Sequence, residues 1–142
     1  MTRTVKAVTV LQPWAAAIIH GTKRIENRTW YTRHRGELAI HTGRSRRELT
    51  PETYRLPVIG RLLPLDDGTL VFGAIIGTVQ LVDCVRLEDL ADDHPVLRPE
   101  AWGGWAFGPW CWILRSPRPI NPPIPWRGER MLFQVQIPAP PQ

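Results

Sequence analysis

The run VFGAIIGTVQLVDCV at residues 71–85 is the strongest strand candidate of the chain and decides its fold class. Apolar and β-branched side chains dominate it, which predicts one long strand over Leu70–Leu87. Gly73 and Gly77 interrupt the pattern, and a glycine inside a strand marks a bend or a bulge. A long strand that bends in this way is typical of a sheet that curls into a barrel.

Shorter elements flank this strand on both sides. Residues 36–42, for example, alternate Leu38 and Ile40 with more polar neighbours, as a half-buried strand does. The predicted strands besides Leu70–Leu87 are Val5–Leu11, Gly36–Thr42, Trp105–Arg115 and Met131–Ile137, and the predicted helices are 13–20 and 51–56. Strands and helices do not alternate regularly, which argues against a doubly wound parallel sheet and favours a mixed, mostly antiparallel barrel.

Length and composition limit the class of protein. A chain of 142 residues suits one domain, so we expect residues 1–142 to form it, with a flexible tail at 138–142. No apolar run approaches the ~20 residues that cross a membrane, and no leader-like block opens the chain. We therefore expect a cytoplasmic protein without a membrane partner. Cys84 and Cys111 are too few for a disulfide framework or a four-cysteine zinc site, and we expect buried thiols.

Basic residues concentrate in the first half of the chain. The net charge is +5, but residues 1–62 hold twelve Lys or Arg against four Asp or Glu, whereas residues 63–142 hold six against nine. A basic half indicates a polyanionic partner, because Lys and Arg displace the counterions condensed on phosphates. A solvated surface is the alternative, and it is the favoured interpretation of the run Arg44, Arg46 and Arg47.

The segment 11–41 holds the side chains best suited to binding or chemistry. It contains Q-P-W at 12–14, G-x-K-x-x-E-x-R-x-W at 21–30 and R-G-x-L-x-I-H at 35–41. Lys23 and Glu26 would need a turn between them to converge, because alternate residues of an extended chain face opposite sides. A solvated loop, or a structural ion pair between Glu26 and Arg28, would explain the same residues without a ligand. The four histidines lack ligand spacing, so we expect no metal and no cofactor.

Together these three motifs resemble the ASCH domain of the PUA-like superfamily. The resemblance continues with GAIIGTVQLVDCV at 73–85, WILRSPRP at 112–119 and Arg127-Gly128, and it covers about residues 5–137. It implies an α+β, mainly β fold: a PUA-like mixed pseudobarrel of about five to six strands with two or three short flanking helices. The family is generally regarded as RNA-binding, so the resemblance implies RNA or a nucleotide or nucleoside derivative as partner.

Carried over residue by residue, the resemblance implies a basic binding cleft. Its predicted residues are Gln12, Trp14, Lys23, Glu26, Arg28, Trp30, Arg35, His41 and Trp112. The cations would meet phosphate or a base carbonyl, and Glu26 would hold them in place or accept from the amine of an unpaired base. Trp14, Trp30 or Trp112 would supply a stacking face, and the amide of Gln12 would meet a Watson–Crick edge.

Structural roles remain open for several of these residues. Core packing is the alternative for Trp112, and a strand histidine with satisfied hydrogen bonds is the alternative for His41. The remaining tryptophans, Trp102, Trp105, Trp110 and Trp126, are expected to pack in the core or in a lid.

The resemblance also admits catalysis. Some small bacterial ASCH proteins are amidohydrolases that deacetylate acetylcytidine, and others are described as ribonucleases. The amidohydrolase pattern is Lys-x-x-Thr with threonine as nucleophile, whereas the third residue after Lys23 here is Glu26. Without that hydroxyl, Glu26 would be the general base for a water, with Lys23 or Arg28 stabilising the oxyanion. We predict an RNA- or nucleotide-binding domain, with such a hydrolase as the alternative and a partner-binding domain as the third possibility.

Overall fold

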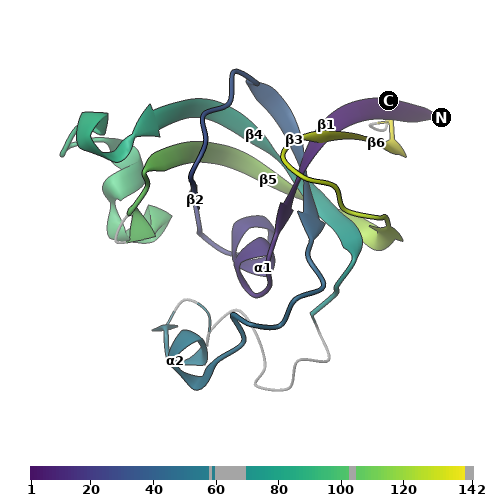
Figure 1. The fold of residues 1–142 in the computed structure, drawn as a ribbon, viewed down its shortest axis with the longest axis horizontal. Helices are drawn as coiled ribbons and strands as arrows, with labels where there is room; N and C mark the ends of the chain where they lie inside the picture. Colours follow the sequence, from purple (N-terminus) through teal and green to yellow (C-terminus); the bar gives the residue numbers. More distant parts are fainter. Residues whose placement is uncertain (58, 60–69, 103–104, 140–142) are drawn as a thin grey trace.

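A strongly curved, mixed β-sheet organises the chain (Figure 1). The computed structural model describes residues 1–57, 59, 70–102 and 105–139, and within these residues six strands form one sheet in the order β2-β5-β4-β3-β1-β6. The strands are β1 (Thr2–Val10), β2 (Ile25–Arg28), β3 (Gly36–Thr42), β4 (Ala74–Arg86), β5 (Trp110–Pro125) and β6 (Phe133–Pro138). β1 and β3 run parallel, and the other neighbours are antiparallel. The predicted mainly β architecture is confirmed.

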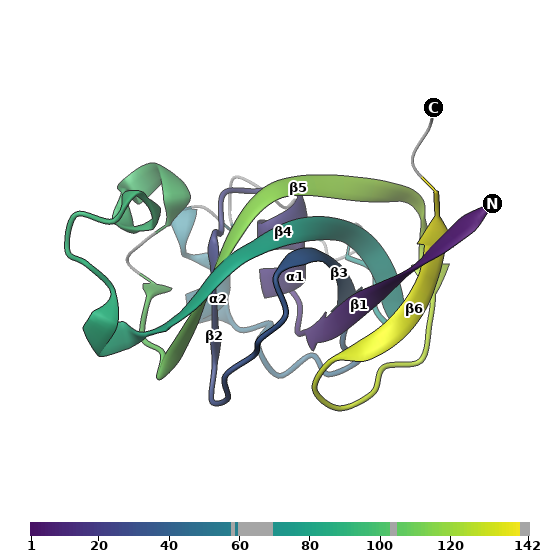
Figure 2. The same ribbon diagram turned by 90° about the horizontal axis from the view of Figure 1, so that it is seen from above.

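The two longest strands, β4 and β5, arch side by side over α1 (Figure 2). Their pairing changes register between Ile75 and Gly77, between Thr78 and Gln80, and between Leu81 and Asp83. Each irregularity adds local twist, so three of them bend the strand pair. The irregularity expected at Gly77 is therefore present, whereas Gly73 lies just before β4, with a positive φ of 69°.

The helices are short. α1 (Trp14–Ile19) lies within the predicted 13–20, and its residues 15–19 are all buried. Ala15, Ile18 and Ile19 pack in the core of the sheet, whereas Ala16 and Ala17 pack with Ile59 and Leu70. α2 (Pro51–Tyr54) begins as expected, because Thr50 Oγ1 accepts from Thr53 N at 3.2 Å, but it ends before 56. Among the described residues, 3-10 turns follow β4 at Leu87–Asp89, Pro95–Leu97 and Pro99–Ala101. No helix in the described part of the chain is long and apolar enough to span a membrane.

The sequence did not predict two strands correctly. β2 is absent from the predicted strands, because only Ile25 among its four residues is apolar. β5 was expected at Trp105–Arg115 but runs on to Pro125 through five prolines. β2 pairs with β5 only between Trp110 and Ile113, so the rest of β5 is a sheet edge among the described residues. Prolines are tolerated at edges and bulges, and both occur here.

The chain ends are paired with each other. The expected tail at 138–142 differs from the structure at its start, because Pro138 belongs to β6 and Ala139 N donates to Met1 O at 3.0 Å. Residues 140–142 lie outside the described residues.

At Gly77 the sheet packs tightly against α1. A Cβ at this position would lie 2.5 Å from Arg118 O and 2.8 Å from Ile19 Cδ1. Backbone atoms of β5 cannot move aside without disturbing the sheet, so a side chain here would push strand and helix apart.

We predict that Gly77→Ala lowers the free energy of unfolding by ~1–3 kcal/mol, the usual cost of overpacking a core. Urea unfolding followed by far-UV circular dichroism measures it. Gln80→Ala, at an exposed position of the same strand, is the control and should stay within ~0.5 kcal/mol of wild type. Equal stability of Gly77→Ala and wild type would contradict the assigned contact.

Candidate functional site

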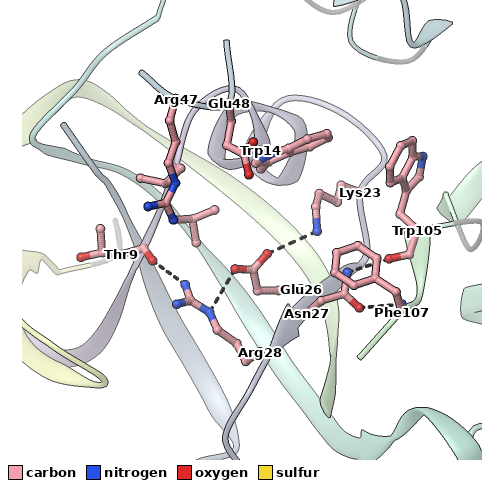
Figure 3. A pocket seen from close by; sticks show the side chains of 12 residues that line it. Thr9, Trp14, Lys23, Glu26, Asn27, Arg28, Arg47, Glu48, Trp105 and Phe107 are labelled. Atoms are coloured by element: carbon pink, nitrogen blue, oxygen red, sulfur yellow. Dashed lines mark hydrogen bonds and ion pairs between the residues drawn. The ribbon is translucent and has the colours of Figure 1, made fainter. Parts of the chain in front are cut away.

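A pocket of about 460 Å³ opens beside β2 and the start of α1 (Figure 3). Its walls combine three kinds of side chain: cations, carboxylates and aromatic rings. The residues that line it are Lys23, Arg28, Arg47, Glu26, Glu48, Trp14, Trp105, Phe107, Thr9, Val10, Leu11 and Asn27.

Glu26 bridges two cations at the centre of this pocket. Its Oε1 lies 3.3 Å from Lys23 Nζ, and its Oε2 lies 3.1 Å from Arg28 Nε. Arg28 also donates through Nη2 to Thr9 O, which ties it to β1. Lys23 reaches Glu26 because the chain turns after α1: Lys23 N donates to Ala17 O at 3.2 Å, and Lys23 Nζ donates to Ile25 O. The turn that the sequence required is therefore present.

Lys23 carries its amino group deep in the wall, and the residue is only 5% exposed. Burial lowers the pKa of Lys23, and the Glu26 carboxylate opposes this shift. Arg28 Nε is also buried and has no hydrogen-bond partner among the described residues, although its charge faces Glu26. The site thus holds cationic side chains with N–H groups that the protein itself does not fully satisfy.

Asn27 fixes the aromatic wall on the other side. Its Nδ2 donates to Trp105 O at 2.6 Å, and its Oδ1 accepts from the backbone N–H groups of Phe107 and Gly108, both at 2.9 Å. Trp105 packs against Trp14 with ring centroids 5.8 Å apart. Phe107 remains 64% exposed, so one of its faces is accessible beside the pocket.

The structure brings together four of the predicted site residues, Trp14, Lys23, Glu26 and Arg28. Gln12 is not among them, although it was expected to read a base. It is 1% exposed, and its amide accepts from Ala16 N at 2.9 Å and donates to Val71 O at 3.0 Å. Gln12 therefore uses its amide to satisfy the first turn of α1.

The predicted aromatic residues Trp30 and Trp112 also lie outside the pocket. Trp112 is fully buried and meets Trp30 edge-on at a centroid distance of 4.9 Å. A ring with no exposed face cannot stack on a base. Arg35 lies elsewhere, pairing with Asp83 at 3.6 Å and stacking near Tyr31.

His41 is a structural residue of the sheet and is 2% exposed. Its Nε2 lies 2.7 Å from the carbonyl of Trp126, which places the ring proton on Nε2, and its Nδ1 accepts from Thr9 Oγ1 at 3.0 Å. Both ring nitrogens are satisfied. The surroundings of His41 therefore match a strand histidine with satisfied hydrogen bonds.

Sequence reasoning missed eight residues that line the pocket: Thr9, Val10 and Leu11, and five polar or aromatic ones. Asn27 stands between the two motif residues Glu26 and Arg28, so its position was a usable signal. Arg47 was expected to be solvated and Trp105 to pack in the core or a lid. Nothing in the local sequence distinguishes Glu48 or Phe107. In the part of the chain that the structure describes, no group of His, Cys, Asp or Glu is arranged as metal ligands.

We predict that acid destabilises the fold partly through His41. Burial lowers the pKa of His41 below 6.5, against the hydrogen bond to Trp126 O that raises it. As the pH falls below about 6.5, the unfolded chain takes up a proton before the folded one, so the free energy of unfolding falls. Urea unfolding between pH 7.5 and 5.5 should show a weaker pH dependence for His41→Gln than for wild type. Parallel curves would contradict the assignment.

Known proteins share this sequence pattern. The model of the ASCH domain family matches residues 8–123. Activating signal cointegrator 1 is 28% identical over 132 residues in Homo sapiens and 31% identical over 128 residues in Mus musculus. These alignments cover 90% and 87% of this chain but 22% and 21% of those proteins, so the chain spans about a fifth of the length of the curated relatives it matches.

Solved structures share the fold. The crystal structure of one mutant of the Zymomonas mobilis ASCH protein has a TM-score of 0.51 at 15% identity, covering 92% of this chain and 87% of that one. A second mutant of the same protein gives 0.50 at 15% identity, covering 92% and 88%. With the family model matching most of its length and the fold in agreement, the chain belongs to the ASCH domain family.

Proposed function

We propose that the chain binds single-stranded RNA or a nucleotide derivative in the pocket beside β2. The observation that carries the proposal is the buried ammonium of Lys23 in the wall of a cavity of about 460 Å³ that is also lined by aromatic rings. Pockets of about 300–1,000 Å³ are usual for small ligands, so a nucleoside is of suitable size.

The charges of the pocket favour a ligand that is both anionic and polar at one edge. Three cations face two carboxylates across its walls, which leaves a formal charge of +1. Arg28 and Arg47 suit a phosphate, and Arg offers it two parallel hydrogen bonds. Glu26 suits the exocyclic amine of a base, and Lys23 suits a base carbonyl. A nucleotide offers all of these groups at once.

The aromatic wall supports stacking. Trp105 and Phe107 come from one segment that Asn27 holds against β2, and the ring of Trp14 packs against that of Trp105. Stacking of one base on an aromatic ring contributes ~1–3 kcal/mol in single-strand recognition. We assign the stacking role to these rings in place of Trp30 and Trp112.

Burying the ammonium of Lys23 is costly for the fold, even though Nζ donates to Ile25 O and pairs with Glu26. A buried ion pair rarely stabilises a protein more than a well-packed apolar residue of similar shape does. Glu26 would still face Arg28 in the absence of the lysine. Ligand binding therefore explains a buried ammonium beside a cavity better than a contribution to fold stability does.

We predict that Lys23→Met weakens nucleotide binding about tenfold or more, because a hydrogen bond to a charged group contributes ~1.5–3 kcal/mol. Tryptophan fluorescence, titrated with the four nucleoside 5′-monophosphates and with single-stranded RNA hexamers, measures the affinity. A Lys23→Met variant that binds every probe as wild type does would exclude this pocket as the site.

Arg28→Gln and Arg35→Gln form a matched pair, since both remove one guanidinium but only Arg28 lines the pocket. We predict that Arg28→Gln weakens RNA binding and lowers the log–log salt slope by ~0.7, the value for one phosphate on a single strand. Arg35→Gln should bind within about twofold of wild type, since Arg35 does not line the pocket and pairs with Asp83. Equal losses in the two variants would indicate general charge attraction without a defined site.

Hydrolysis is the outcome that would replace this proposal. Both oxygens of Glu26 already face cations, and the residue occupies the position of the threonine nucleophile in the amidohydrolase pattern. We therefore expect acetylcytidine to bind without being deacetylated. Release of cytidine by wild type, and its loss in Glu26→Gln with binding retained, would instead identify an amidohydrolase that uses Glu26 as base.

A further inference from the structure

A second, smaller cavity lies where the 94–101 turns meet the start of β2 and the middle of β5. It measures about 220 Å³, and Arg24, His94 and Arg115 line it together with apolar residues of the same segments. The consecutive residues Lys23 and Arg24 thus line different pockets. We propose that this second pocket binds a phosphoryl group through Arg24, Arg115 and His94.

Arg24 has N–H donors that make no hydrogen bond and a positive charge without a nearby carboxylate among the described residues. Its Nη1 donates to Ile18 O at 3.3 Å and to Lys23 O at 2.9 Å, and its Nη2 donates to Gly21 O at 3.1 Å. All three acceptors are carbonyls, so no carboxylate among the described residues neutralises this half-buried guanidinium. A guanidinium has five N–H donors, and two remain, which is the number of a bidentate phosphate contact.

Other arginines show what is missing at Arg24. Arg3, Arg28 and Arg86 each face a carboxylate within 4 Å, at 2.5, 3.1 and 3.8 Å. Burial lowers the pKa of Arg24 without an opposing contribution from an acidic group. An anion in the adjacent cavity would supply the missing countercharge.

Arg115 and His94 complete the set of donors from two other segments. Within the described residues, Arg115 makes no ion pair, and its side chain lies exposed on β5. His94 Nδ1 accepts from Val96 N at 3.0 Å, so the neutral ring carries its proton on Nε2 as a donor. No carboxylate is among the described residues that line the cavity, which favours an anion over a cation.

The size of the cavity suits a single phosphoryl group better than a whole nucleoside. A volume of about 220 Å³ lies below the ~300 Å³ at which pockets begin to enclose whole small molecules. A free phosphate or the terminal phosphate of a chain fits this description, whereas a nucleoside does not. The proposal is independent of the nucleotide pocket, because it rests on different side chains.

Inorganic phosphate, titrated calorimetrically at constant ionic strength set with sodium chloride, tests the site. We expect Arg115→Gln to weaken phosphate binding about tenfold or more, as the loss of a charge-assisted hydrogen bond implies. Arg118→Gln, an equal charge change three residues along the same exposed edge, should leave the affinity within about twofold. Arg24→Gln is the second variant and should also weaken phosphate binding. Because Arg24 donates to three carbonyls near the end of α1, the affinity of this variant is compared at a temperature at which it is still folded.

Two further arms separate the sources of phosphate and the two pockets. An RNA hexamer with a 5′-phosphate should bind more tightly than the same hexamer without it if the site takes a chain end, and equally if it takes free phosphate. Lys23→Met should leave inorganic phosphate binding unchanged. Phosphate binding that is absent in wild type, unaffected by Arg115→Gln, or lost in Lys23→Met would overturn the proposal.

Discussion

The close contact between α1 and the curled sheet at Gly77 is the constraint on which the rest of the molecule depends. With no side chain at this position, the β4 backbone approaches both Ile19 and the carbonyl of Arg118. This lets β4 and β5 bend around a helix whose residues 15–19 are all buried. The end of α1 is thereby fixed, and Lys23, which bonds to Ala17 O, enters the pocket from it. The packing of α1 against the sheet therefore also determines where the ammonium of Lys23 lies.

The pocket also depends on a very short strand. β2 has four residues and joins the sheet only through β5, yet it presents Glu26, Asn27 and Arg28 to the cavity. Asn27 links it to Trp105 and Phe107, about 80 residues away in the chain. Hydrogen bonds therefore link the charged wall to the aromatic wall, and a site fixed in this way before binding costs less to order when the ligand binds.

Sequence reasoning succeeded where a feature is local. The strand at 74–86 follows from a nearly continuous run of apolar and β-branched residues, and the strand at 36–42 follows from apolar alternation. The motif around Lys23 identified the charged centre of the pocket. Sequence reasoning failed where the outcome depends on distant contacts. Gln12, His41 and Trp112 have side chains equally suited to a site or a core, and only the folded chain shows that all three are buried. Phe107 becomes part of the pocket through a hydrogen bond to Asn27 that no local pattern encodes.

The proline-rich second half of β5 has a consequence for how copies of this chain meet. An exposed strand edge with free N–H groups is a template on which another chain can add a strand, and this is a common route to aggregation. The five prolines between 117 and 125 have no N–H, and those that face the free edge leave it with fewer donors for such an addition. Intermolecular strand growth is therefore disfavoured along the edge that β2 leaves uncovered. Resistance to fibril formation at high protein concentration would follow from the same residues that made this strand hard to predict.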